Sequence, residues 1–131
     1  MIQRIQTVFL LLNFFYLLII YLFFDPKFFA VTIFDHEILI EIEIYIISCL
    51  IITSISILLF KKRFAQLFSN KIQIFLHIIY SLIITIEFVV SESFNSFTKL
   101  LIPIICLIFI FLANKFIKKD EDLIKSIDRI R

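Results

Sequence analysis

The residues best suited to chemistry lie in one long apolar run, Ile72 to Val90. When successive residues are placed about 100° apart on a helix, one side of this run gathers polar and ionisable side chains: Gln73, His77, Tyr80, Ser81 and Glu87. Ionisable groups at membrane depth are functional candidates by default. A histidine and a carboxylate on one helix face could relay protons or hold a cation. Their separation along a helix is about 15 Å, so His77 and Glu87 cannot touch.

The same two residues also have a structural interpretation, which we favour. Glu87 lies about one turn from the end of the run and could extend toward Lys99. His77 could satisfy its ring nitrogens by hydrogen bonding to another helix. Either interpretation requires that this face of the helix meets protein or water rather than lipid.

Four long apolar runs, which position these residues, fill most of the 131-residue chain. Each has roughly the length that about 20 helical residues need to cross a bilayer. Hydrophobic residues make up 62% of the chain and the mean hydropathy is +1.09, whereas soluble domains are about 45–50% apolar. We therefore predict an all-α membrane protein, a four-transmembrane-helix bundle that forms a single domain over residues 1–131. The predicted spans are Val8 to Phe24, Ile44 to Phe60, Ile72 to Val90 and Leu100 to Ile117.

The composition is also skewed toward residues with AT-rich codons, with 18 Phe and no Gly or Trp. This skew indicates an AT-rich genome. Without glycine there is no Gly-x-x-x-Gly contact, so helix packing must use Ser, Cys, Thr and Ala with some interhelical hydrogen bonds. Pro103 comes early in the fourth run, where a proline is tolerated. We expect no disulfide between Cys49 and Cys106, because both fall inside predicted spans.

The basic residues predict the orientation. Eleven of the 13 lie on one side of the predicted spans: Arg4, Lys61, Lys62, Arg63, Lys71, Lys115, Lys118, Lys119, Lys125, Arg129 and Arg131. Short loops rich in Lys and Arg stay cytoplasmic, so both termini should face the cytoplasm. The first run follows a short positive segment and could be a secretory signal. It lacks a small-residue cleavage site, so we expect it to remain as a span.

The segment from Asp25 to Glu43 is the longest outer loop. Residues Ile40 to Ile44 alternate apolar and acidic side chains, which favours a strand, so the loop could form a small two-stranded ribbon. The alternative is that the second helix begins near Ile38. The acidic residues and histidine of this loop, Asp35, His36, Glu37, Glu41 and Glu43, could suggest a cation site. Neighbouring side chains point in different directions, so we favour a solvated turn and predict no metal ligand.

The tail from Lys118 to Arg131 predicts a short amphipathic cytoplasmic helix. Its apolar residues recur at helical spacing: Leu123, Ile124, Ile127 and Ile130. Glu121 precedes Lys125 by four residues, the favourable order for a helical ion pair. We expect the tail to continue the fourth span and to rest on lipid headgroups or on a partner. A frayed stop-transfer anchor is the alternative.

No motif of a known catalytic chemistry is present. The sequence contains no HExxH, GxSxG, P-loop or Cys-x-x-Cys pattern. We therefore predict a protein that is not an enzyme, with no catalytic residue, no cofactor and no nucleic-acid partner.

The two ends of the chain carry a resemblance. The opening Met1 to Thr7 followed by a Leu-rich span, and the closing Leu112 to Lys115 and Lys118 to Arg131, resemble the bacterial domain of unknown function 4293 family. A basic inner loop such as Lys61-Lys62-Arg63 is also similar to that family. The resemblance implies a small four-span protein of the bacterial inner membrane and supplies no activity. The chain differs from the family in its lack of glycine and its short, apolar outer loop.

Both distinctive segments are predicted to be cytoplasmic, so we expect any shared role at the inner face of the membrane. The candidate interaction residues there are Gln3, Arg4, Gln6, Asp120, Glu121, Asp122, Arg129 and Arg131. Their charges are complementary, and Arg4 could meet Glu121.

Two functions compete on these observations. We favour a non-enzymatic scaffold or regulatory subunit of a membrane complex, which acts through its inner face. The alternative is a small transporter or an ion- or proton-conducting subunit that uses the polar face of the third span. The expected partners are the lipid bilayer and either another membrane protein or a second copy of the chain.

Overall fold

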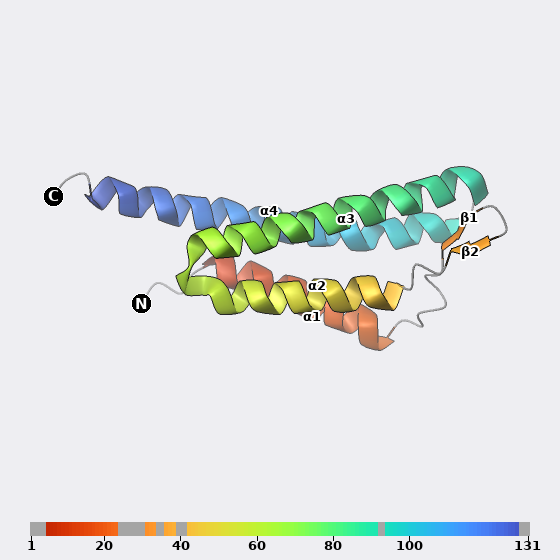
Figure 1. The fold of residues 1–131 in the computed structure, drawn as a ribbon, viewed down its shortest axis with the longest axis horizontal. Coiled ribbons are helices and arrows are strands. Elements are labelled where there is room, and N and C mark those ends of the chain that lie inside the picture. The colour runs from red at the N-terminus through yellow and green to blue at the C-terminus, as the bar shows by residue number, and fades with distance from the viewer. Residues whose placement is uncertain (1–4, 24–30, 34–35, 39–41, 92–93, 129–131) are drawn as a thin grey trace.

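The computed structural model describes residues 5–23, 31–33, 36–38, 42–91 and 94–128. Four long helices account for most of them (Figure 1): α1 (Ile5–Phe23), α2 (Ile42–Leu58), α3 (Arg63–Ser91) and α4 (Phe94–Asp128). A short 3-10 helix, η2 (Leu59–Lys61), joins α2 to α3. Two short strands, β1 (Val31–Ile33) and β2 (His36–Ile38), lie between α1 and α2 in the chain.

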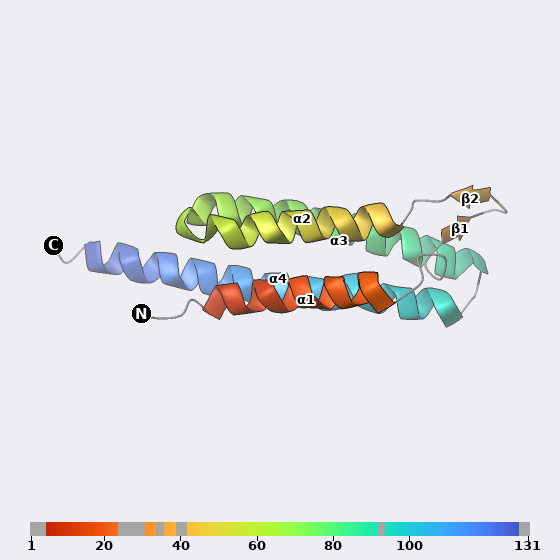
Figure 2. The same cartoon turned by 90° about the horizontal axis from the view of Figure 1, so that it is seen from below.

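Successive helices run in opposite directions, which gives an up-down-up-down bundle (Figure 1). Both α1 and α3 pack against α2 and α4. In the view of Figure 2, α2 and α3 form one layer and α1 and α4 form the other. We call the end where α2 leads into α3 the basic end, because Lys61, Lys62 and Arg63 lie there. The opposite end, which carries β1 and β2, is the ribbon end.

The outer surface of the bundle is apolar. Large side chains such as Phe15, Phe75 and Phe111 are each more than half exposed, whereas polar side chains fill much of the interior. A soluble protein has the reverse distribution. All four helices are long and apolar enough to cross a membrane, which confirms the predicted number of spans and indicates a multi-pass membrane protein.

The buried positions recur at alternating intervals of three and four residues. On α1 they are Gln6, Leu10, Asn13, Leu17 and Ile20. This spacing keeps one seam of each helix facing its neighbours in knobs-into-holes packing. The apolar core lies in the half of the bundle nearer the ribbon end and includes Leu17, Ile20, Tyr45, Ile46, Cys49, Tyr80, Ile84, Ile102 and Cys106. Both cysteines of this core are free thiols.

Helix α3 begins much earlier than the third apolar run. It starts at Arg63, so Lys71, which the sequence placed in a loop, is a helical residue. The intervening residues can be helical because the polar side chains among them, Gln66, Ser69 and Asn70, are turned into the bundle. The loop between the second and third spans is correspondingly short.

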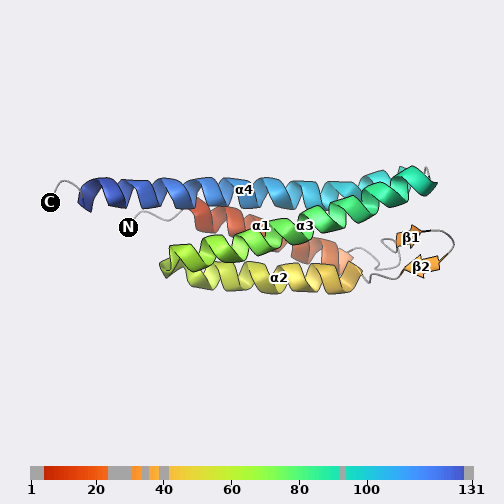
Figure 3. The same cartoon turned by 45° about the horizontal axis from the view of Figure 1, so that its top comes forward.

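Helix α4 is the longest element, with 35 residues, about 50 Å of helix. The hydrocarbon of a bilayer is about 30 Å thick, so α4 exceeds what one span requires. Figure 3 shows its C-terminal part passing beyond the ends of the other helices at the basic end. We call residues 118–128 the α4 extension.

Pro103 lies well inside α4 rather than at its start. The expectation of an early position is wrong, because the helix begins at Phe94, ahead of the apolar run. An interior proline removes one backbone hydrogen bond of the helix. Neighbouring helices make this tolerable in membrane bundles, and Pro103 is buried among them.

Strands β1 and β2 form an antiparallel pair in which Val31 is opposite Ile38 and Ile33 is opposite His36. Strand β1 lies against α3. The alternating segment Ile40 to Ile44 does not supply the strands: helix α2 begins at Ile42, and residues 39–41 lie outside the described residues. Helix is favoured from Ile42 onward because it satisfies backbone groups internally as the chain enters the bundle.

Candidate functional site

A line of buried polar side chains runs along the interior of the bundle from the basic end. We call it the polar seam, and all four helices contribute to it. Its buried members are Gln6 and Asn13 of α1; Tyr45, Thr53 and Ser56 of α2; and Gln66, Ser69, Asn70, Gln73 and His77 of α3. The half-buried Asn114 of α4 joins them. The helices bring these residues together because each places its polar residues on the buried three-and-four repeat.

Thr53 is the junction between three helices. Its hydroxyl oxygen accepts hydrogen bonds from Gln73 Nε2 of α3 at 2.8 Å and from Asn13 Nδ2 of α1 at 3.4 Å. It donates to the Cys49 carbonyl of its own helix at 2.7 Å. A hydroxyl has one donor and two acceptor positions, so this side chain is fully used.

Asn70 is the second junction, closer to the basic end. Its Oδ1 accepts a hydrogen bond from the Ser56 hydroxyl of α2 at 2.5 Å, and its Nδ2 donates to Asn114 Oδ1 of α4 at 2.7 Å. Beside it, the Ser69 hydroxyl lies 3.4 Å from the Ile52 carbonyl, to which it donates. Together, Thr53 and Asn70 link α1, α2, α3 and α4 by side-chain hydrogen bonds.

His77 marks the end of the seam nearer the apolar core. Its Nδ1 is hydrogen-bonded to the Tyr45 hydroxyl of α2, which confirms the expectation that His77 bonds to another helix. The Tyr45 ring also stacks on Tyr80, with centroids 3.9 Å apart. Two aromatic side chains and an imidazole therefore form one contact between α2 and α3.

Several buried polar atoms of these residues have no hydrogen-bond partner among the described residues. They are both side-chain polar atoms of Gln6 and of Gln66, Asn13 Oδ1, Gln73 Oε1, His77 Nε2 and the Tyr80 hydroxyl. Buried polar groups are normally paired, so these atoms mark interior positions where water could hydrogen-bond, and of the named atoms only His77 Nε2 is basic enough to take up a proton.

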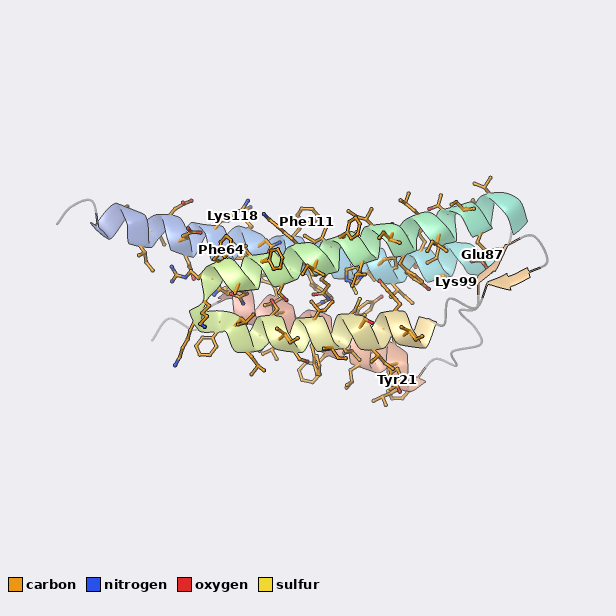
Figure 4. All side chains as sticks on the ribbon, in the orientation of Figure 1. Tyr21, Phe64, Glu87, Lys99, Phe111 and Lys118 are labelled. Atoms are coloured by element: carbon orange, nitrogen blue, oxygen red, sulfur yellow. The ribbon has the colours of Figure 1, made fainter. Side chains whose placement is uncertain are left out.

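An ion pair lies at the ribbon end of the same interior. Lys99 Nζ of α4 donates to Glu87 Oε1 of α3 at 2.9 Å, and both side chains are about 95% buried. Figure 4 shows the two residues together near β1. The expected approach of Glu87 to Lys99 is confirmed. Instead of extending to the membrane surface, however, the pair is enclosed by the helices.

A family model matches almost the whole chain. The model is that of Domain of unknown function (DUF4293), and it matches residues 2–130. The chain belongs to this family. Membership of DUF4293 confirms the resemblance that the two ends of the sequence indicated. No curated protein and no solved structure shows significant similarity to the chain.

Four of the five residues of the predicted polar face of this DUF4293 chain are buried: Gln73, His77, Tyr80 and Glu87. The structure does not bring Ser81 to them. The Ser81 hydroxyl donates to the Ile78 carbonyl of its own helix at 2.8 Å. This hydrogen bond therefore does not join two helices.

The sequence interpretation missed several seam residues: Gln6, Asn13, Gln66, Ser69 and Asn70. A signal for two of them, Gln66 and Asn70, was present, because Gln66, Asn70, Gln73 and His77 repeat at intervals of four, three and four residues. That repeat is the heptad pattern of a buried helix face. It extends the polar face toward the basic end, beyond the start of the apolar run.

The predicted cytoplasmic-face residues fall into different environments. Gln3, Arg4, Arg129 and Arg131 lie outside the described residues. Gln6 is fully buried inside the bundle, so it does not lie on a surface with the acidic residues of α4. Asp120 and Glu121 are half-buried and Asp122 is exposed.

Among the described basic residues, Arg63 contacts this acidic segment. Its Nη1 lies 3.5 Å from the Asp120 carbonyl, to which it donates. This contact ties the start of α3 to the start of the α4 extension.

Nothing in the described residues assembles a metal site, since no three His, Cys, Asp or Glu side chains gather there. Asp35 and Glu41 of the outer loop lie outside those residues. In the parts that are described, the seam offers amide, hydroxyl, phenol and imidazole groups. Their chemistry is hydrogen bonding and proton exchange.

Proposed function

We propose that this protein is a non-enzymatic scaffold or regulatory subunit of a membrane complex in the bacterial inner membrane, and that it binds its partner through the α4 extension. The observation that carries the proposal is that α4 continues past the bundle with both charged and apolar side chains exposed. A partner of this kind is another membrane-associated protein or a second copy of the chain.

The α4 extension has the surface of an interaction helix. Leu123 and Ile124 are 54% and 43% exposed, and exposed lysines and an aspartate accompany them: Lys118, Lys119 and Asp122. An isolated helix shorter than about 12–15 residues is marginal in water. The extension would therefore gain stability from a surface that covers its apolar residues.

The interior of the bundle also favours a scaffold. Hydrogen bonds at Thr53 and Asn70 join all four helices, and the Glu87–Lys99 pair joins α3 to α4 at the other end. These bonds hold the helices in one register. A bundle held in this way presents α4 as a rigid support for the extension.

The orientation that we propose places the basic end in the cytoplasm. The described residues near that end include Lys61, Lys62, Arg63 and Lys71, and α4 adds Lys115, Lys118 and Lys119. Lys and Arg in short loops and next to spans are retained on the cytoplasmic side. The extension would then project into the cytoplasm.

Site-specific cross-linking in native membranes tests the scaffold. A photo-reactive residue at Leu123 should give a cross-link to one discrete protein, and the same residue at Leu82, which is 58% exposed within α3, should contact lipid. Leu123→Ala with Ile124→Ala should reduce recovery of the complex at least tenfold.

The matched control is Leu82→Ala with Leu101→Ala, which removes two exposed leucines from the spans and should leave recovery unchanged. If position 123 contacts only lipid, and deletion of residues 120–131 leaves the complex intact, the proposal fails.

A second candidate function is proton conduction along the polar seam. It is favoured by His77, which is fully buried, contacts Tyr45 through one nitrogen and has no partner for Nε2 among the described residues. Histidine is among the side chains that form proton relays inside membranes.

Reconstituted vesicles that contain a pH-sensitive dye test conduction. A protein that conducts along the seam should show proton flux that His77→Leu abolishes and that Ser81→Ala retains, because Ser81 bonds only within its helix. Flux equal to that of protein-free vesicles would exclude this candidate.

A further inference from the structure

A groove on the outside of the bundle, between α3 and α4 near the basic end, differs from the rest of the apolar surface. It has a volume of about 490 Å³. Helix α3 contributes Leu67, Lys71 and Ile74, and α4 contributes Phe111, Asn114, Lys115 and Lys118. Three lysines line it and no carboxylate does, so the groove is cationic.

The residues of the groove are ordered by depth. On α3 the lining positions are spaced by four and three residues, and on α4 Phe111, Lys115 and Lys118 have the same spacing, so each set forms one stripe along its helix. Because the two helices are antiparallel, Ile74 and Phe111 both lie toward the bundle centre and the lysines lie toward the basic end. Leu67 is the exception, because it lies one turn beyond Lys71 toward the basic end. Figure 4 shows this order on α4, with Phe111 nearer the centre than Lys118.

This gradient matches the shape of a phospholipid. The whole groove lies within the two stretches Arg63–Val89 and Lys99–Ile124, which are long and apolar enough to span a membrane, and an acyl chain would pass against its apolar residues Ile74 and Phe111. The lysines lie one to two turns farther along, which is about 5–10 Å, where a phosphate group would sit. We propose that this groove binds an anionic phospholipid, with its phosphate between Lys71, Lys115 and Lys118 and an acyl chain against Ile74 and Phe111.

The site has a polar connection to the interior. Asn114 Oδ1 accepts the hydrogen bond from Asn70 Nδ2 at 2.7 Å, which leaves the Asn114 amide nitrogen as a donor to a headgroup oxygen in the groove. A soluble anion would use the lysines and Asn114 but not Phe111, which is 61% exposed. The apolar half of the groove therefore favours a lipid over a free phosphate. The inference is separate from the scaffold function and does not depend on it.

The absence of tryptophan from the chain permits a direct measurement. Phe111→Trp places a single fluorophore in the groove, and Phe75→Trp places one at a similarly exposed position of α3, which is not among the residues that line it. Each variant is purified as the full chain and reconstituted in phosphatidylcholine with a small fraction of brominated lipid. Brominated phosphatidylglycerol should quench the tryptophan fluorescence of Phe111→Trp more than brominated phosphatidylcholine does. In Phe75→Trp, the two brominated lipids should quench the fluorescence equally.

Charge variants in the Phe111→Trp background identify the headgroup contacts. Replacing Lys71, Lys115 and Lys118 by Gln should lower the preference for phosphatidylglycerol on the order of a hundredfold, since each lysine contributes about fivefold. The matched control replaces Lys61, Lys62 and Lys119 by Gln, which changes the net charge equally outside the groove, and should retain most of the preference. Replacing the three groove lysines by Arg should keep the binding and shows that the site still folds.

Three results would overturn the inference. One is equal quenching of Phe111→Trp by the two brominated lipids. Another is equal loss of preference in the groove and control triple variants, which would mean general attraction to an anionic surface. The third is displacement of the lipid by glycerol phosphate alone, which would mean that the groove recognises a soluble anion.

Discussion

The two ends of the bundle interior hold buried polar groups in different ways. At the ribbon end, α3 and α4 enclose an ion pair, Glu87–Lys99. Toward the basic end the buried groups are neutral amides and hydroxyls, shared among all four helices. A buried charge needs an ionic partner, because desolvation of an unpaired ion is costly. A neutral network divides its contribution among many bonds, each of which is worth about 0.6 kcal/mol on average in membranes. Substitutions at the two ends should therefore differ in size.

The largest effect is expected at the ion pair. Glu87→Ala leaves the Lys99 ammonium buried and should lower the free energy of unfolding by about 3–5 kcal/mol, as measured by denaturant titration in mixed micelles. Replacing both residues by Leu should recover most of this loss, because no unpaired charge remains. If a single substitution in the pair leaves the free energy of unfolding within about 0.5 kcal/mol of the parent value, water reaches the pair. The two ends of the interior would then not differ in the way described above.

A smaller effect is expected at Asn70. The change Asn70→Ala removes the bonds to Ser56 and Asn114 and should cost about 1–3 kcal/mol in the same titration. Asn114→Ala removes only one of the two bonds and should cost less. Equal losses in the two variants would mean that the Ser56 bond contributes nothing.

Thr53 sharpens the comparison further. Thr53→Val keeps the shape of the side chain but removes the junction hydroxyl, with an expected loss of about 1 kcal/mol. Thr85→Val is the matched control, since the Thr85 hydroxyl bonds only to the Ser81 carbonyl of its own helix. A loss at Thr85 as large as that at Thr53 would assign the effect to helix propensity rather than to interhelical bonds.

The smallest effect is expected outside the bundle. Arg63→Gln removes a long contact to the Asp120 carbonyl and should change the free energy of unfolding by less than about 0.5 kcal/mol. Hydrogen exchange should report it instead, with faster exchange of amides in residues 120–128. Unchanged exchange would mean that this contact does not hold the α4 extension.

Much of the fold and part of the seam could be predicted. Gln73, His77 and Glu87 were identified because they interrupt an apolar run, and the approach of Lys99 to Glu87 followed from their places near the same membrane surface. Gln66, Ser69 and Asn70 were missed, since they precede the run and resemble a polar loop. Gln6 was assigned to a surface, although it is fully buried, because its place near the chain start favoured exposure.

The sequence by itself determined the four membrane-length helices, because length and hydropathy are local properties that need no partner. It also determined the basic asymmetry that underlies the proposed orientation. Only the tertiary structure decided that Asn13 and Gln73 converge on Thr53, that Ser56 and Asn114 converge on Asn70, and that a groove forms beside Lys71 and Lys115. Those contacts depend on the rotation of each helix about its axis and on which helices are neighbours. Both are fixed when polar side chains, excluded from the apolar surroundings, find one another inside the bundle.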